Sequence, residues 1–119
     1  MDEGIKNHWI EALESGRYRP GTGALRETRA DGGDSFCCLG VLADLIKPEA
    51  WRGKCDDQLG SSLWRHGETD TFSGLGLLRQ DIGESVGLDL VQQKRLAELN
   101  DAADPPSYEA VVSYIKEHL

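Results

Sequence analysis

Apolar residues recur at helical spacing in three parts of the chain. They fall at i, i+4, i+7 and i+8 within residues 3–15, and at i, i+3, i+4 and i+7 within residues 107–119. Compatible spacing occurs in residues 77–86. Each pattern places the apolar side chains on one face of a helix, so the sequence predicts three amphipathic helices.

Residues at the helix ends add to this prediction. Asp2 would cap the first helix, and Gly87 would close the helix over residues 77–86. A helix over residues 90–99 is predicted from Asp89, its expected cap, and from Asn100 after its end.

A further helix is predicted over residues 36–46, where apolar residues cover nearly every side. Asp34 or Ser35 would cap its start, and Pro48 would prevent its extension. Gly40 costs about 1 kcal/mol relative to Ala inside a helix, so its presence favours close approach by a neighbouring backbone. We therefore expect this helix to be the central, buried one.

The segments between these helices are rich in turn residues and contain only short strand signals. Residues 17–33 predict a turn-rich connection with one short strand near residues 24–28. Residues 61–66 and 69–72 predict a hairpin around a Gly-Glu turn. The expected fold class is α+β and mainly helical, with about five helices around a central buried helix and one small β-hairpin.

The composition is that of a single compact globular domain, residues 1–119. Hydrophobic residues make up 39% of the chain and charged residues 29%, which is too apolar for a disordered protein. No apolar run approaches the roughly 20 residues that cross a bilayer, and the acidic start lacks a secretion signal. Three cysteines, two of them adjacent, make a poor disulfide framework and favour a reducing, cytoplasmic location.

The formal net charge of −8 argues against direct binding of nucleic acid, because the phosphate backbone would repel such a surface. Residues 17–29 differ from the rest, with a local charge of +3. This basic segment is a candidate contact for a partner protein, or it pairs with acidic groups of the same molecule. The acidic remainder leaves open a third role, mimicry of a nucleic acid.

Two tryptophans lie in the middle of the chain, outside the predicted helices. Trp51 and Trp64 either close over the core or form an exposed aromatic contact of the kind that dominates protein interfaces. Together with the basic segment they make up the candidate binding residues. These are Arg17, Arg19, Arg26, Arg29, Trp51 and Trp64.

Cys37 is the strongest candidate for catalysis. In the first turn of the predicted helix 36–46, unpaired backbone N–H groups and the helix dipole would lower the pKa of its thiol. His66, in the predicted hairpin, would be the base of a cysteine-dependent hydrolase or transferase. The alternative is that the thiol is a small apolar filler in a buried helix.

No metal or cofactor is expected. Cys37 and Cys38 would point about 100° apart on a helix, and Cys55 and His66 lack the CxxC or HxxxH spacing of a metal site. The Gly-Thr-Gly sequence at residues 21–23 lacks the lysine of a phosphate loop.

Several sequence blocks at both ends and in the centre of the chain resemble a widespread group of short proteins of tailed phages and prophages. These blocks are W-x-x-A-L-x-S-G-x-Y from Trp9, G-x-L from Gly23, F-C-C-L-G-V-L-x-D-L from Phe36, Trp51, L-x-x-L-N-D from Leu96, and S-Y-x-x-V-V-x-x-I from Ser107. The C-C-L-G-V-L block is the most specific, and residues 52–95 match poorly.

The resemblance implies a phage or prophage context in the cytoplasm of a host cell, and it carries no established activity. Accessory phage proteins of this size often bind and inhibit host proteins, including defence systems, and this role is an analogy. The sequence therefore predicts a small acidic accessory protein that acts as a non-enzymatic protein-interaction module, an inhibitor of a host or defence protein. The alternatives are the Cys37–His66 enzyme and the acidic nucleic-acid mimic.

Overall fold

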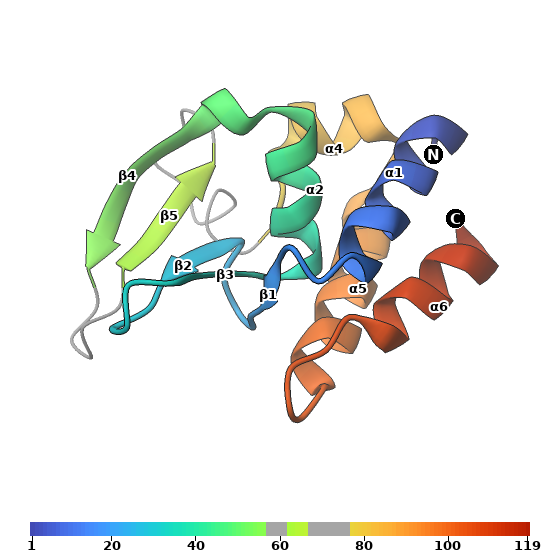
Figure 1. Ribbon diagram of the computed structural model, residues 1–119. Helices are drawn as coiled ribbons and strands as arrows, with labels where there is room; N and C mark the ends of the chain where they lie inside the picture. The colour runs from blue at the N-terminus through green and yellow to red at the C-terminus, as the bar shows by residue number, and fades with distance from the viewer. Residues whose placement is uncertain (57–61, 67–76) are drawn as a thin grey trace.

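The chain forms a small mixed sheet and a group of helices, which Figure 1 shows beside each other. The computed structural model describes residues 1–56, 62–66 and 77–119. The fold is α+β, as predicted. In chain order the elements are α1 (Glu3–Glu14), β1 (Arg19–Pro20), β2 (Arg26–Thr28), β3 (Asp34–Phe36), α2 (Cys38–Ile46), the 3-10 turn η1 (Pro48–Ala50), β4 (Trp51–Asp56), β5 (Ser62–His66), α4 (Gln80–Val86), α5 (Leu90–Ala102) and α6 (Glu109–His118).

Two helices begin at residues whose side chains cap them. Asp2 accepts a hydrogen bond from the Ile5 N–H at 3.0 Å at the start of α1. Asp89 and Gln92 form a complete capping box at the start of α5. Gly87, with φ of 77°, ends α4 in the left-handed conformation that glycine adopts without strain. These three helix ends lie where local sequence chemistry predicts them.

The start of α2 differs from the prediction. The helix begins at Cys38, and its cap residue Cys37 provides no side-chain hydrogen bond. Asp34 and Ser35 are not helix caps, because residues 34–36 form β3. The pairing of β3 with β1 and β2 holds these residues in an extended backbone, which outweighs their preference for a capping position.

The strands form one five-stranded sheet in the order β1-β3-β2-β5-β4. Strand β1 pairs with β3 in parallel, and the other pairs are antiparallel. Strand β2 confirms the short strand predicted near residues 24–28. Its register places Arg26 opposite Phe36 and Glu27 opposite Leu63, so β2 lies between β3 and β5.

The hairpin predicted over residues 61–66 and 69–72 has the wrong pairing. Residues 62–66 form strand β5 as expected, but its partners are β2 and β4. Strand β4 was not predicted, because its sequence W-R-G-K-C-D combines a glycine with charged residues and lacks strand periodicity. The other predicted arm, residues 69–72, lies outside the described residues.

Side chains from α1, α2, α5 and α6 form most of the apolar core. All six residues from 38 to 43 in α2 are buried. Trp9, Leu96 and Ile115 are fully buried, one from each of the other three helices. The Trp9 indole also donates a hydrogen bond from Nε1 to the carbonyl oxygen of Cys38 at 3.0 Å, which fixes α1 against α2.

Gly40 allows the backbone before β2 to contact α2 directly. A Cβ atom at this position would lie 2.6 Å from the carbonyl carbon of Leu25 and closer still to its oxygen. The same carbonyl oxygen accepts a hydrogen bond from the Cys37 N–H at 3.3 Å. The expected close approach of a neighbouring backbone is therefore present, and Leu25 provides it.

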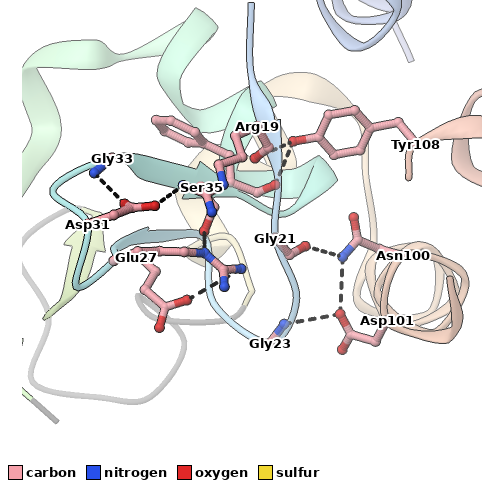
Figure 2. A network of polar contacts seen from close by, with 12 residues as sticks. Arg19, Gly21, Gly23, Glu27, Asp31, Gly33, Ser35, Asn100, Asp101 and Tyr108 are labelled. Atoms are coloured by element: carbon pink, nitrogen blue, oxygen red, sulfur yellow. Dashed lines mark hydrogen bonds and ion pairs between the residues drawn. The ribbon is translucent and has the colours of Figure 1, made fainter. Parts of the chain in front are cut away.

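A buried polar network joins α5 to the same region (Figure 2). Asn100 accepts a hydrogen bond from the Cys38 N–H at 3.0 Å and donates one from Nδ2 to the Gly21 carbonyl at 2.9 Å. Asp101 accepts from the Gly23 N–H at 3.1 Å. Asn100 is 2% exposed, so its bonds to Cys38 and Gly21 satisfy backbone groups that water does not reach, whereas the bond from Gly23 to Asp101 lies at the surface.

We expect Gly40→Ala to destabilise the fold by at least about 2 kcal/mol, because the added methyl group overlaps the Leu25 carbonyl. In an open helix the same change would stabilise by up to about 1 kcal/mol. Gly4→Ala in α1 is the matched control, since its Cβ would meet only the side chain of Asp2. Urea unfolding measures the stability of both variants. If the unfolding midpoint of Gly40→Ala equalled that of the wild type, the close approach of the Leu25 carbonyl to Gly40 would be contradicted.

We expect Asn100→Ala to lower the free energy of unfolding by about 2–3 kcal/mol, because it leaves the buried Cys38 N–H without an acceptor. Asn7→Ala, an exposed position in α1, should change stability by less than about 0.5 kcal/mol. Thermal and urea denaturation of the two variants check this difference. Equal effects at the two positions would contradict the role given to the network.

Candidate binding surface

Arg26 lies at the centre of a group of aromatic side chains on the sheet. Its guanidinium carbon is 4.1 Å from the ring centroid of Trp64, 5.4 Å from that of Trp51 and 5.5 Å from that of Phe36. These rings come from β5, β4 and β3. A cation within about 6 Å of an aromatic face is attracted by the ring quadrupole, so Arg26 holds the three rings together.

Hydrogen bonds fix this arrangement from the side of β3. The Arg26 guanidinium donates to Asp34 Oδ2 from Nη2 at 2.6 Å and from Nε at 2.9 Å. Thr28 donates to the other Asp34 oxygen at 2.6 Å and accepts from the Trp64 indole at 2.9 Å. The Arg26 and Asp34 side chains are 21% and 27% exposed, so water screens their ion pair only in part.

Asp44 of α2 connects the aromatic group to the helices. Its Oδ1 accepts a hydrogen bond from the Trp51 indole at 2.9 Å, and its Oδ2 accepts one from the Tyr18 hydroxyl at 2.7 Å. Burial, together with this bond, raises the pKa of Tyr18 to about 12. The Tyr18 ring also contacts Phe36 edge to face, with centroids 5.1 Å apart. We call these five half-buried residues the aromatic surface: Tyr18, Arg26, Phe36, Trp51 and Trp64.

The aromatic surface contains half of the predicted binding residues, and the other three lie outside it. Arg19 donates to Asp31 at 3.0 Å, and Arg29 donates from Nε to the Ser35 hydroxyl at 3.1 Å (Figure 2). Arg17 is exposed and donates to a hydroxyl of its own turn. The basic segment therefore does not form one continuous patch, and Arg26 alone reaches the tryptophans.

The thiol of Cys37 does not have the properties of a nucleophile. The residue is 5% exposed, and burial raises the pKa of its thiol to about 11. The backbone groups at the start of α2 lower the pKa of the thiol, as expected, but desolvation outweighs their effect. Cys38 is fully buried, and burial raises its pKa as well. These observations favour the interpretation of both thiols as core filler.

His66 forms its hydrogen bond and its ring contact with residues other than Cys37. Its Nε2 lies 3.0 Å from the carbonyl oxygen of Lys47, and its ring meets Trp51 with centroids 4.8 Å apart. A carbonyl only accepts hydrogen bonds, so Nε2 carries the proton. Nδ1 is buried and has no hydrogen-bond partner among the described residues. Burial lowers the pKa of His66, which is therefore a neutral side chain behind Trp51 near neutral pH.

Among residues 1–56, 62–66 and 77–119, no three His, Cys, Asp or Glu side chains are grouped so that they could hold a metal ion. In the same part of the chain, no helix has the length and apolar character needed to span a bilayer.

Most of the residues that organise the aromatic surface were not predicted as binding residues from the sequence. Asp34 was expected to be a helix cap, and Asp44, Tyr18 and Phe36 were noted only as parts of sequence blocks. Their spacing along the chain carries no signal, since the hydrogen bond from Tyr18 to Asp44 spans 26 residues. The blocks themselves have a structural explanation, because Trp9, Cys38 and Asn100 belong to the contacts around α2.

Comparison with known proteins gives one match. A family model described as "Domain of unknown function (DUF8296)" matches residues 1–119, the whole of the chain. No curated protein and no solved structure matches the chain.

We expect the free energy of unfolding to decrease as the pH is lowered, because His66 has a lower pKa in the folded protein than in the unfolded chain. Because burial lowers its pKa in the folded state, the unfolded chain binds more protons between that value and the ordinary 6.5. Stability is then complete above about pH 7.5 and declines as the pH falls toward 5. Melting temperatures of His66→Gln should depend less on pH in this window, whereas the exposed control His118→Gln should follow the wild type.

We expect both described thiols to react slowly with iodoacetamide in the folded protein. At pH 8 a pKa of about 11 leaves about one Cys37 thiolate in a thousand. The experiment uses a Cys55→Ser background, so that only Cys37 and Cys38 are counted by mass spectrometry. Rapid labelling should appear in urea, and selective labelling of folded Cys37 near pH 6 would revive the cysteine enzyme.

Proposed function

The chain belongs to the DUF8296 family, and we propose that it acts as a non-enzymatic protein-interaction module that binds through the aromatic surface. The observation that carries the proposal is the convergence of Arg26, Trp51 and Trp64 on one side of the sheet. Tryptophan, tyrosine and arginine are the residue types that contribute most of the binding energy at protein interfaces.

The rigidity of these side chains also supports binding. Each indole N–H already has an acceptor, Asp44 for Trp51 and Thr28 for Trp64. Side chains that are held in place before association lose little conformational entropy when a partner arrives. All of them remain half-buried, so part of each surface is open to contact.

The distribution of charge favours a protein partner at this position. Residues 17–66, which include all the strands of the described part of the chain, carry eight basic and seven acidic side chains. The rest of the chain carries five basic and fourteen acidic ones. The aromatic surface thus lies in the part of the chain that is nearly neutral. A partner of ordinary surface charge meets little long-range repulsion there.

We place the partner in a bacterial host, as a host or defence protein that the chain inhibits. This part of the proposal rests on the resemblance of the C-C-L-G-V-L and L-N-D blocks to phage and prophage proteins. Mimicry of a nucleic acid would instead use the acidic helices, and its binding would weaken steeply with salt.

The test is affinity capture from a bacterial host lysate, followed by titration of the purified partner. We expect Trp64→Ala to weaken binding at least 30-fold, about 2 kcal/mol, as for a residue that dominates an interface. Tyr114→Ala is the matched control, since Tyr114 is a half-buried aromatic residue of α6 whose ring contacts His118. It should bind like the wild type.

Circular dichroism and melting temperature establish that each variant is folded before its binding is compared. If folded Trp64→Ala bound the partner as tightly as the wild type, the aromatic surface would not be the interface. Arg26→Gln gives an independent check, because it removes the cation that holds the three rings together while keeping a polar side chain.

A further inference from the structure

A hollow lies between α4 and the start of α5. Its volume is about 540 Å³, and Leu78, Leu88 and Leu90 provide the apolar part of its lining. Leu78 and Leu88 are each 3% exposed and belong to the core, whereas Leu90 is 53% exposed. None of the lining residues belongs to the sheet, so this hollow is distinct from the aromatic surface.

Two aliphatic side chains beside the hollow face water. Leu90 is 53% exposed and Val91 is 77% exposed, and they are the only large hydrophobic residues that are exposed in the described part of the chain. They are adjacent and occupy the first turn of α5. Adjacent exposed aliphatic residues next to an apolar hollow are typical of a contact site for another protein.

Hydrogen bonds and close packing hold together the backbone segments that surround the hollow. The buried Gln93 side chain accepts a hydrogen bond from the Leu78 N–H at 3.0 Å and donates one to the Leu88 carbonyl at 3.3 Å. Gly83 packs directly on it, since a Cβ there would lie 2.7 Å from Gln93 Nε2. The capping box of Asp89 fixes the first turn of α5. Leu90 and Val91 are therefore displayed on a fixed backbone.

The charged residues that line the hollow are acidic. No lysine or arginine is among its described lining residues, and Arg79, just before α4, is paired with Asp81 at 3.3 Å. Glu84 and Asp89 line the hollow, and no ion pair engages either of them within the described residues. A second copy of this chain would bring two such acidic rims together, which is unfavourable. A cationic partner would be attracted.

We propose that this hollow binds a basic amphipathic helix of a partner protein. An apolar side chain of that helix packs against Leu90 and Val91, and its lysine or arginine side chains face Glu84 and Asp89. Recognition of this kind needs an apolar groove and a rim of opposite charge, and the structure provides both. This site is separate from the aromatic surface, so a failure of one proposal would not affect the other.

The probe is a fluorescein-labelled 18-residue peptide of leucine and lysine at helical spacing, compared with a peptide that has glutamate in place of lysine. We expect the leucine–lysine peptide alone to bind, and to shift the amide NMR signals of residues 78–93. Leu90→Ser with Val91→Ser should weaken binding at least tenfold, because it removes the apolar contact from positions that are exposed and tolerate the change. Fluorescence anisotropy measures the affinities.

Charge variants test whether the basic peptide is attracted by Glu84 and Asp89 or by the net negative charge of the whole protein. Glu84→Gln with Asp89→Asn should weaken binding and reduce its dependence on salt, and asparagine still caps α5. Glu109→Gln with Glu117→Gln removes the same two charges from α6 and should leave binding unchanged. Trp64→Ala should also leave it unchanged, which distinguishes this site from the aromatic surface.

Three results would overturn the proposal. One is that neither peptide binds, or that both bind equally well. Another is that the serine double variant binds the leucine–lysine peptide like the wild type. The third is that sedimentation shows a dimer of this chain which the serine double variant abolishes, since a second copy would then occupy the hollow.

Discussion

The close contact between the Leu25 carbonyl and Gly40 joins the sheet to α2 and sets how the two pack together. It allows the backbone before β2 to lie directly on α2, with the Cys37 N–H bonded to the same oxygen. Because a side chain at Gly40 would separate the two segments, the sheet could not reach its position beside the helix. Asn100 then completes the junction by binding the Cys38 N–H and the Gly21 carbonyl.

This junction accounts for the most specific part of the sequence, the C-C-L-G-V-L block. The two cysteines are buried where α2 begins, and burial raises the pKa of both thiols. Their role is to fill space around backbone groups that Trp9 and Asn100 satisfy. The buried residues of the sequence blocks thus build the fold, whereas Tyr18, Phe36 and Trp51 of the same blocks are half-buried members of the aromatic surface.

The two surfaces that we propose for partners differ in chemistry. The aromatic surface combines an arginine with three rings in a nearly neutral part of the chain. The hollow at the start of α5 combines exposed aliphatic groups with acidic side chains. Separate sites of this kind would allow a protein of 119 residues to hold two partners, or two parts of one partner, at the same time.

Local chemistry along the chain determined the helices, the caps at Asp2 and Asp89, and the helix end at Gly87, because these depend on residues within one or two turns of one another. It also indicated that Arg26, Trp51 and Trp64 were candidates for binding. Only the tertiary structure decided that these three meet, and that Asp34 belongs to a strand instead of a helix cap. Strand pairing and burial bring together residues tens of positions apart, and no pattern within a single segment encodes such a pairing.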